Sequence, residues 1–294
     1  MKVTSLPDAQ PRPRRVAVGT FDGVHLGHRE VIRGNDTVLT FDPHPLAVVK
    51  PDAVPKLIYS HEIKCDLIAG LGVEELVVIP FNEEFSKKTA DEFIEEVLVH
   101  RLQATHVSVG ENFQFGQRAQ GNPQLLSAHA EFETRVVPLV EVKGETVSSS
   151  HIRGLVAAGE VKEASEFLGG PFLFEGEVVH GDKRGRELGF PTANIVPSDQ
   201  LVVPGHGVYA AWAHGHPAAV NVGVRPTFNT GRGLLIEAFL LDFDGDLYDR
   251  RLRLDFVARL RGERRFESVD DLVAQMELDV QRAREICSAT VFRR

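Results

Sequence analysis

Two histidines, His25 and His28, stand three residues apart in GTFDGVHLGH at 19–28, where an apolar segment leads into a predicted helix. Imidazoles at that spacing in a first helical turn can point the same way. The free N–H groups and the positive dipole end there favour an anion, and Gly19 and Gly27 let backbone approach a ligand closely. The segment predicts a phosphate cradle. A turn with two surface histidines, or a metal pair lacking a third ligand at suitable spacing, are the alternatives.

A second unusual string, GDKRGRELGFPTAN at 181–194, combines glycines and basic residues with a proline turn. It is not a Walker loop, because the GxxxxGK[ST] pattern is absent. Glu237 is a third candidate, because it interrupts LLIEAFLL at 234–241, a run that is apolar on both faces. A carboxylate there must be paired, protonated or functional, and burial would make it a better base. A basic surface turn and a structural ion pair with an arginine are the respective alternatives.

Together with four further segments, these strings resemble the bacterial bifunctional riboflavin kinase/FAD synthetase family. The resemblance runs from Val16 to the last predicted helix, with the segments in the family's order. The further segments are TFDPHP at 40–45, GENFQFG at 110–116, SSSHIR at 148–153 and NVGVRPTF at 221–228.

For the N-terminal half, the resemblance implies a nucleotidylyltransferase that converts FMN and ATP to FAD and pyrophosphate by in-line attack on the α-phosphate. Catalysis of this kind needs positioning and charge stabilisation more than a nucleophile. The implied catalytic residues are His25, His28 and Arg153. The implied nucleotide and phosphate ligands are Gly19, Phe21, Gly27, Ser149 and Ser150, and Asn112 is expected to bind flavin.

For the C-terminal half, the resemblance implies a riboflavin kinase that makes FMN. Glu237 would accept the proton of the ribityl 5′-hydroxyl as that oxygen attacks the γ-phosphate of ATP. Thr192 and Asn194 would bind Mg²⁺ and phosphates, and neutral oxygens suit Mg²⁺, which completes its shell with phosphate and water. The remaining implied residues are Gly181, Arg186 and Gly189 for ATP, and Asn221 and Arg225 for flavin.

The chain departs from the family pattern at two places. The stretch 29–39 is shorter than the family's usual helix, and Gly34 and Asn35 predict a tight turn in its place. Phe239 stands where the family often has histidine. A single-activity riboflavin kinase with a non-catalytic N-terminal domain, and a non-enzymatic flavin sensor, are therefore kept as alternatives to the bifunctional enzyme.

The periodicity of apolar residues predicts an α/β unit followed by a β unit. Residues 1–169 should form a Rossmann-like, doubly wound domain, and residues 170–294 a small antiparallel barrel with a terminal helix. The N-terminus is predicted to be a loose arm. Expected strands cover 15–18, 37–41, 75–79, 105–109, 134–140, 172–179, 208–213, 218–222, 234–243 and 251–257, and expected helices 28–32, 60–71, 89–102, 152–167 and 269–286.

Composition excludes several classes of protein. The chain has 294 residues and a net charge of -9, which argues against a nucleic-acid-binding protein. No apolar run approaches the length of a membrane span. The two cysteines, Cys65 and Cys287, form no disulfide framework, so a reducing cytoplasm is expected. The expected partners are the small molecules riboflavin, FMN and ATP.

Overall fold

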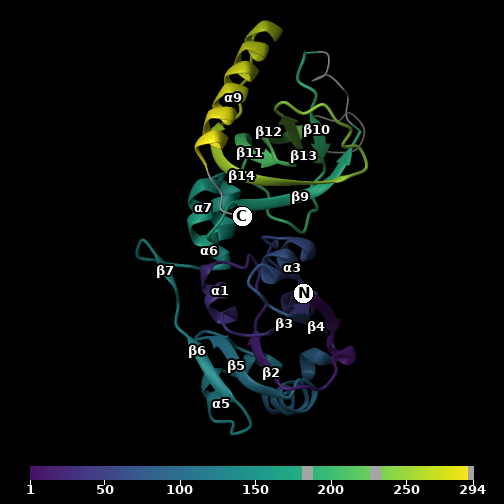
Figure 1. The fold of residues 1–294 in the computed structure, drawn as a ribbon, viewed down its shortest axis with the longest axis vertical. Helices are drawn as coiled ribbons and strands as arrows, with labels where there is room; N and C mark the ends of the chain where they lie inside the picture. The colour runs from purple at the N-terminus through teal and green to yellow at the C-terminus, as the bar shows by residue number, and fades with distance from the viewer. Residues whose placement is uncertain (181–187, 226–232, 291–294) are drawn as a thin grey trace. The chain divides into compact units, whose positions relative to one another are not determined.

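The computed structural model describes residues 1–180, 188–225 and 233–290. Contacts between Cα atoms divide the chain into two compact units (Figure 1). The first comprises Met1–Pro55 and His61–Ser148, and the second comprises Lys56–Ser60 and Ser149–Arg294.

The first unit is built on a six-stranded sheet in the order β1-β4-β3-β2-β5-β6, in which all neighbours pair in parallel. The strand order reverses between β2 and β5, and doubly wound sheets bind ligands beyond the carboxyl ends of strands at such a point. This confirms the predicted α/β fold. The strands are β1 (Lys2–Ser5), β2 (Arg14–Val18), β3 (Thr37–Asp42), β4 (Glu75–Pro80), β5 (Ala104–Gly110) and β6 (Glu133–Val137).

Helices cover both faces of this sheet. Val16 and Val18 pack in one core cluster with Phe93, whereas Ala17 packs with Ile32 in another, as expected when strand residues alternate between faces. The helices are α1 (Leu26–Ile32), α2 (Pro45–Val49), α3 (His61–Ala69), α4 (Ala90–Glu92), continued by the π-helix η4 (Phe93–Arg101), and α5 (Pro123–Ser127). Short 3₁₀ turns cover Leu6–Asp8, Pro51–Ala53, Phe85–Lys87 and Gln117–Ala119, and β7 (Glu141–Val142) pairs with β8 (Glu145–Thr146).

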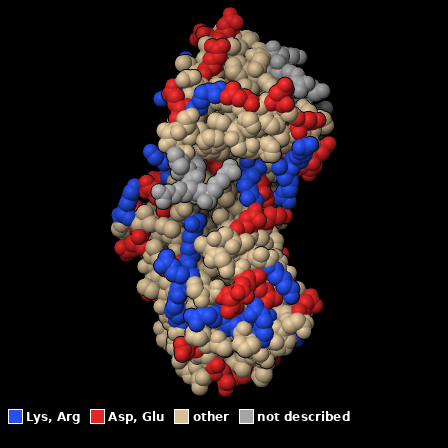
Figure 2. All heavy atoms as spheres, viewed as in Figure 1, with Lys and Arg blue, Asp and Glu red and all other residues tan. Residues whose placement is uncertain are grey.

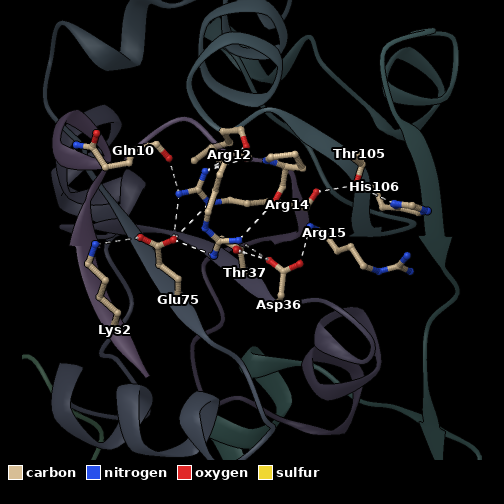
Figure 3. Close-up of polar contacts among 12 residues, drawn as sticks. Lys2, Gln10, Arg12, Arg14, Arg15, Asp36, Thr37, Glu75, Thr105 and His106 are labelled. Carbon is tan, nitrogen blue, oxygen red and sulfur yellow. Dashed lines mark hydrogen bonds and ion pairs between the residues drawn. The ribbon is translucent and has the colours of Figure 1, made fainter.

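The N-terminal segment is ordered, so the predicted loose arm is wrong. Lys2–Ser5 forms the edge strand β1 and pairs with β4. The buried guanidinium of Arg14 donates to the Glu75 carboxylate, with Nη2 to Oε2 at 3.0 Å, and to the carbonyl of Gln10 (Figure 3). Arg14 and Glu75 begin their strands, so this network lies at the amino ends of the sheet, away from the edge where ligands bind.

The shortened stretch after α1 closes through Gly34 and Asn35, which confirms the predicted turn. Gly34 has φ +76°, a conformation that favours glycine. The buried amide of Asn35 donates to the carbonyl of Ile32 at 3.2 Å and to Ser108 Oγ at 3.1 Å. The amide therefore ties the end of α1 to β5 without a further helical turn.

The second unit contains a closed barrel with the strand order β10-β13-β12-β11-β14-β9, all antiparallel. The predicted barrel is confirmed, but β10 was missed because it is only three residues long. The strand expected at 234–243 ends at Leu240, just as the one expected at 134–140 ends at Val137. The barrel strands are β9 (Phe172–Val179), β10 (Ala193–Ile195), β11 (Gly207–Ala213), β12 (His216–Arg225), β13 (Gly233–Leu240) and β14 (Arg251–Arg261).

The helix predicted at 152–167 is two helices, α6 (Ser149–Ala158) and α7 (Val161–Leu168). Gly159 separates them with φ +86°, and a Cβ there would lie 2.6 Å from Tyr209 Oη, so only glycine fits. Helix α7 packs on β9 and β14, and α6 packs on α7. Both helices thus group with the barrel, whereas the sequence predicts a domain boundary after residue 169.

The terminal helix α9 (Val269–Ala289) packs across β11, β12 and β14 (Figure 1). Of the predicted apolar stripe, Ala283 is buried, while Leu272, Val273, Met276 and Val280 are half-buried. Asp279 is also buried on this side, and its carboxylate pairs with Arg261 at 2.8 Å. An ion pair, rather than apolar packing alone, therefore holds α9 to the barrel.

Candidate functional site

The carboxyl edge of the parallel sheet carries His25 and His28, two of the residues predicted for the N-terminal half. The loop after β2 leads into α1, so His25 becomes the N-cap of that helix and His28 lies in its first turn. A Cβ on Gly27 would lie 3.3 Å from the His25 ring, and one on Gly19 would lie 3.0 Å from the Phe21 ring. Both glycines thus make room for aromatic rings.

The two imidazoles stack on each other. Their centroids are 3.5 Å apart with an interplanar angle of 14°, and Phe21, which is buried, meets His28 edge-on at 5.3 Å. The backbone N–H of His28 donates to Nδ1 of His25 at 3.2 Å, so the proton of a neutral His25 lies on Nε2. Nδ1 of His28 is buried and has no hydrogen-bond partner within residues 1–180, 188–225 and 233–290.

Both histidines are neutral at physiological pH. Burial lowers the pKa of His25 from 6.5 to about 4. Burial, followed by the charges of His25 and Lys64, holds the pKa of His28 well below 6.5. Stacked rings at this separation disfavour a second charge as well. The pair can therefore donate hydrogen bonds to a phosphate but carries no positive charge before a ligand arrives.

Lys64 is a charged group beside this pair that the sequence analysis missed. It lies in the first turn of α3, half-buried, and interacts electrostatically with His28, Asp22 and Asp42. Burial lowers the pKa of Lys64, and the two carboxylates oppose that shift. The feature of the sequence that could have revealed Lys64 is its position in a predicted helix. A helix that follows a parallel strand begins at the carboxyl edge of the sheet, so residues in its first turn lie at that edge.

Asn112 follows β5 at the same edge of the sheet, and its side chain is exposed. The aromatic residues around it fix the loop: Phe113 and Phe115 stack at 5.5 Å, and Phe115 packs on Phe93 at 5.3 Å. A Cβ on Gly121 would lie 2.6 Å from the Phe115 ring, which explains the glycine. The phenylalanines of the GENFQFG segment thus anchor the loop while the asparagine is presented to solvent.

Ser149, Ser150 and Arg153 lie in the first turns of α6, in the second unit. Nη2 of Arg153 donates to Ser150 Oγ at 3.2 Å. The Ser150 hydroxyl and the Arg153 guanidinium are therefore linked at the N-terminus of α6, where the sequence analysis expects an anion-binding segment.

The barrel aligns the second set of predicted residues in one row. Asn194 on β10 is the register partner of Glu237 on β13, which in turn is the partner of Asn221 on β12. Nδ2 of Asn221 donates to Glu237 Oε2 at 3.2 Å. The neighbours Ile236 and Ala238 are fully buried, so the row lies on the outer face of the barrel.

Glu237 is half-buried on β13, although its flanks are apolar. Strand β13 buries alternate residues inside the barrel, whereas Phe239 on the outer face packs on another part of the chain. Phe239 meets Phe190 of the GFPTAN signature at 5.3 Å with the rings nearly perpendicular. The described partner of the carboxylate is the amide of Asn221 rather than an arginine.

The signature segment reaches this row through Thr192 and Asn194. The amide nitrogen of Asn194, a buried residue, donates to the carbonyl of Thr192 at 3.4 Å. Gly189 is exposed with φ +87°. Gly181 and Arg186 lie outside the described residues, as does the side chain of Arg225, whose backbone pairs with Gly233.

Comparison with known proteins defines the class. A family model described as FAD synthetase matches residues 8–151, and one described as riboflavin kinase matches residues 168–287. The chain is thus a transferase with a nucleotidyltransferase domain followed by a kinase domain, as the sequence analysis predicts.

Relatives over most of the chain define the family. Bifunctional riboflavin kinase/FMN adenylyltransferases from Listeria monocytogenes and Bacillus subtilis are each 36% identical, covering 92% and 91% of this chain and 91% and 90% of theirs. The Escherichia coli protein of that name is 35% identical over 94% of this chain and 93% of its own. This chain belongs to the bifunctional riboflavin kinase/FMN adenylyltransferase family.

One solved structure has the same architecture throughout. It is described as a macrolide-efflux protein from Streptococcus pneumoniae, is 30% identical, covers 97% of this chain and 99% of its own, and superposes with a TM-score of 0.87. In the described part of this chain, no helix has the length and apolar character needed to cross a bilayer. Lys and Arg are interleaved with Asp and Glu on the face drawn in Figure 2.

Proposed function

We propose that this chain phosphorylates riboflavin to FMN in its barrel and adenylylates FMN to FAD in its parallel α/β unit, using ATP for both reactions. The observation that carries the proposal is the row formed by Asn194, Glu237 and Asn221 on the outer face of the barrel. Such a row presents a carboxylate base next to neutral oxygen ligands. This arrangement is unexpected in a sensor that only holds flavin.

In the kinase reaction, Glu237 accepts the proton of the ribityl 5′-hydroxyl while that oxygen attacks the γ-phosphate and ADP leaves. The hydrogen bond from Asn221 holds the carboxylate in one orientation, which general base catalysis requires. Asn221 also lies on the side where flavin is proposed to bind, together with Arg225.

The donor set fits Mg²⁺ bound together with ATP. Thr192 and Asn194 offer neutral oxygens, and the amide nitrogen of Asn194 is engaged with the carbonyl of Thr192. No cluster of three or more His, Cys, Asp or Glu side chains suited to a metal occurs among the described residues. We propose that Thr192 and Asn194 hold the metal, whose charge offsets that of the phosphates, with Gly181, Arg186 and Gly189 over the nucleotide.

In the adenylyl transfer, a phosphate oxygen of FMN attacks the α-phosphate of ATP, and pyrophosphate leaves with the electron pair of the broken bond. His25 and His28 donate hydrogen bonds to the phosphates, beside Gly19, Phe21 and Gly27. We assign Asn112 to the flavin and Ser149, Ser150 and Arg153 to the phosphates. These groups position and stabilise charge, as this chemistry requires.

The proposal is tested by incubating the purified chain with riboflavin, ATP and Mg²⁺ and separating the flavins over time. FMN that appears first, followed by FAD, is the expected result. FMN alone would show that the shortened α/β unit is not catalytic. Neither product, with flavin still bound, would replace the proposal with a flavin sensor. Omitting Mg²⁺ should stop both steps, because the ATP phosphates then lack their counter-charge.

The histidine pair predicts an unusual titration. The C–H resonances of His25 are expected to titrate near pH 4 and those of His28 well below the ordinary range of a histidine, so both rings should be neutral at neutral pH. Nuclear magnetic resonance checks this, with His25→Gln and His28→Gln assigning the signals. A midpoint near the reference value of about 6.5 for either ring would contradict the neutral pair.

We place the chain in the cytoplasm on the strength of its two unpaired cysteines. Cys65 is half-buried and Cys287 buried, and neither forms a disulfide. Burial raises the pKa of both thiols, that of Cys287 to about 11, which keeps them protonated and unreactive in a reducing compartment.

A further inference from the structure

Lys64 lies where three elements of the first unit converge. It is in the first turn of α3, which connects β3 to β4, while Asp42 ends β3 and Asp22 lies in the loop between β2 and α1. Its electrostatic interactions with Asp22, Asp42 and His28 place its ammonium at the carboxyl edge of the sheet, beside the stacked histidines. Lys64 therefore faces the proposed adenylyl-transfer site.

In the described part of the chain the ammonium group of Lys64 has no ion pair, although the charges of Asp22 and Asp42 act on it. Among the residues that the structure describes, none forms an ion pair within 4.0 Å of its Nζ or a hydrogen bond with it, although the side chain is half-buried. Exposed lysines in the same unit do find partners, as Lys87 does with Glu83 at 2.9 Å. A partly desolvated cation without a close partner is costly unless a ligand supplies the anion.

The histidines cannot supply positive charge here, because both are neutral. The leaving pyrophosphate accumulates negative charge as the bond between the α-phosphorus and the bridging oxygen breaks. In the first unit, the charge of Lys64 acts on His28, as that of Arg29 acts on His25. A lysine binds phosphate as a flexible point charge and needs no planar geometry.

We propose that Lys64 binds the β- and γ-phosphates of ATP in the adenylyl-transfer site and holds them as they leave as pyrophosphate. This assignment rests on the proposed adenylyl transfer and adds a residue to it. FMN carries a single phosphate that stays in the product, so its binding should not depend on Lys64.

The test measures binding and turnover separately in the full-length chain. Binding of pyrophosphate with Mg²⁺ is measured by calorimetry for the wild type, Lys64→Met, Lys64→Arg and the exposed control Lys87→Met. Lys64→Met is expected to weaken pyrophosphate binding by about 10- to 100-fold, the range for a lost hydrogen bond to a charged group. Lys64→Arg should retain much of the binding, and Lys87→Met all of it, while affinity for FMN stays unchanged throughout.

Turnover provides the second measurement. FAD formation from added FMN should show a raised KM for ATP and a lowered kcat in Lys64→Met, whereas FMN formation by the barrel of the same preparation should be unchanged and so report intact folding. Unchanged pyrophosphate affinity in Lys64→Met would overturn the assignment, as would equal loss of FMN and pyrophosphate binding. If the wild type made no FAD, the proposed adenylyl transfer would be wrong. The pyrophosphate affinities measured by calorimetry would still show whether Lys64 binds this anion.

Discussion

Glu237→Gln is expected to abolish FMN formation and leave FAD formation from added FMN intact. Glutamine keeps the size of the side chain and can still bond to Asn221, but it cannot accept the ribityl proton. Loss of a general base lowers the rate by about 10²–10⁴-fold. The rate of riboflavin phosphorylation is measured by separating the flavins, with ATP and riboflavin saturating so that the effect is seen in kcat.

Two controls accompany this variant. Glu277→Gln makes the same change on the exposed side of α9, outside the row, and should phosphorylate riboflavin at the wild-type rate. Conversion of FMN to FAD by Glu237→Gln tests whether the rest of the chain is intact. If Glu237→Gln phosphorylated riboflavin as fast as Glu277→Gln, another group would have to take the proton.

Arg14→Met is expected to destabilise the first unit by about 3–5 kcal/mol, because removing the buried partner leaves the Glu75 carboxylate with only the more exposed Arg12 and Lys2 as counter-charges. The Arg14 side chain is 1% exposed and that of Glu75 is 6% exposed. The guanidinium also donates to the carbonyls of Gln10 and Leu102, so its loss would free the N-terminal segment and the end of η4 together.

Arg12→Met is the matched control. Arg12 also pairs with Glu75, at 3.2 Å, but its side chain is 39% exposed, so its loss should cost about 0–1 kcal/mol. Urea unfolding followed by circular dichroism measures the change, while the fluorescence of Trp212 in β11 reports the barrel separately. Equal free energies of unfolding for Arg14→Met and Arg12→Met would contradict this prediction. A shifted Trp212 transition in Arg14→Met alone would also contradict it, because the effect of Arg14 would then not be confined to the first unit.

The same network predicts how acid acts on the first unit. Desolvation would raise the pKa of Glu75, but hydrogen bonds from Thr4 and Arg14 and the charges of Arg14 and Arg12 outweigh it, so the pKa lies below 4.5. Glu75 therefore stabilises the fold at any pH above 4.5, and this contribution disappears as the pH falls through its lowered pKa. The stability difference between the wild type and Glu75→Gln should shrink in that range.

The features that the sequence predicted well are those that depend on local pattern. Short apolar runs predicted the strands of both sheets. Gly34 and Asn35 predicted the turn that replaces the second half of a helix. The histidines were correctly expected at the start of α1. Their charge state was not predictable, because it depends on stacking and burial that only the assembled sheet provides.

Two of the failures have the same physical cause, which is contact between distant residues. The prolines and charges before Arg14 favour a loose arm, but Glu75 pairs with Arg14 and draws the segment into the sheet. The helix predicted at 152–167 runs through Gly159, because nothing nearby in the sequence reveals that Tyr209 blocks a side chain there. Lys64 escaped notice because a single basic residue on a helix has no pattern.

The closed barrel restricts where the length of this chain can vary. Because each strand is paired on both sides, inserting one residue into β10, β12 or β13 would move Asn194, Glu237 or Asn221 from the outer face to the interior. Deletions outside the strands do not shift that register. The stretch after α1 in the first unit is short in this way, and the amide of Asn35 closes it without a further helical turn. Length variants of this enzyme are therefore expected in its connections, with the spacing inside the three strands kept unchanged.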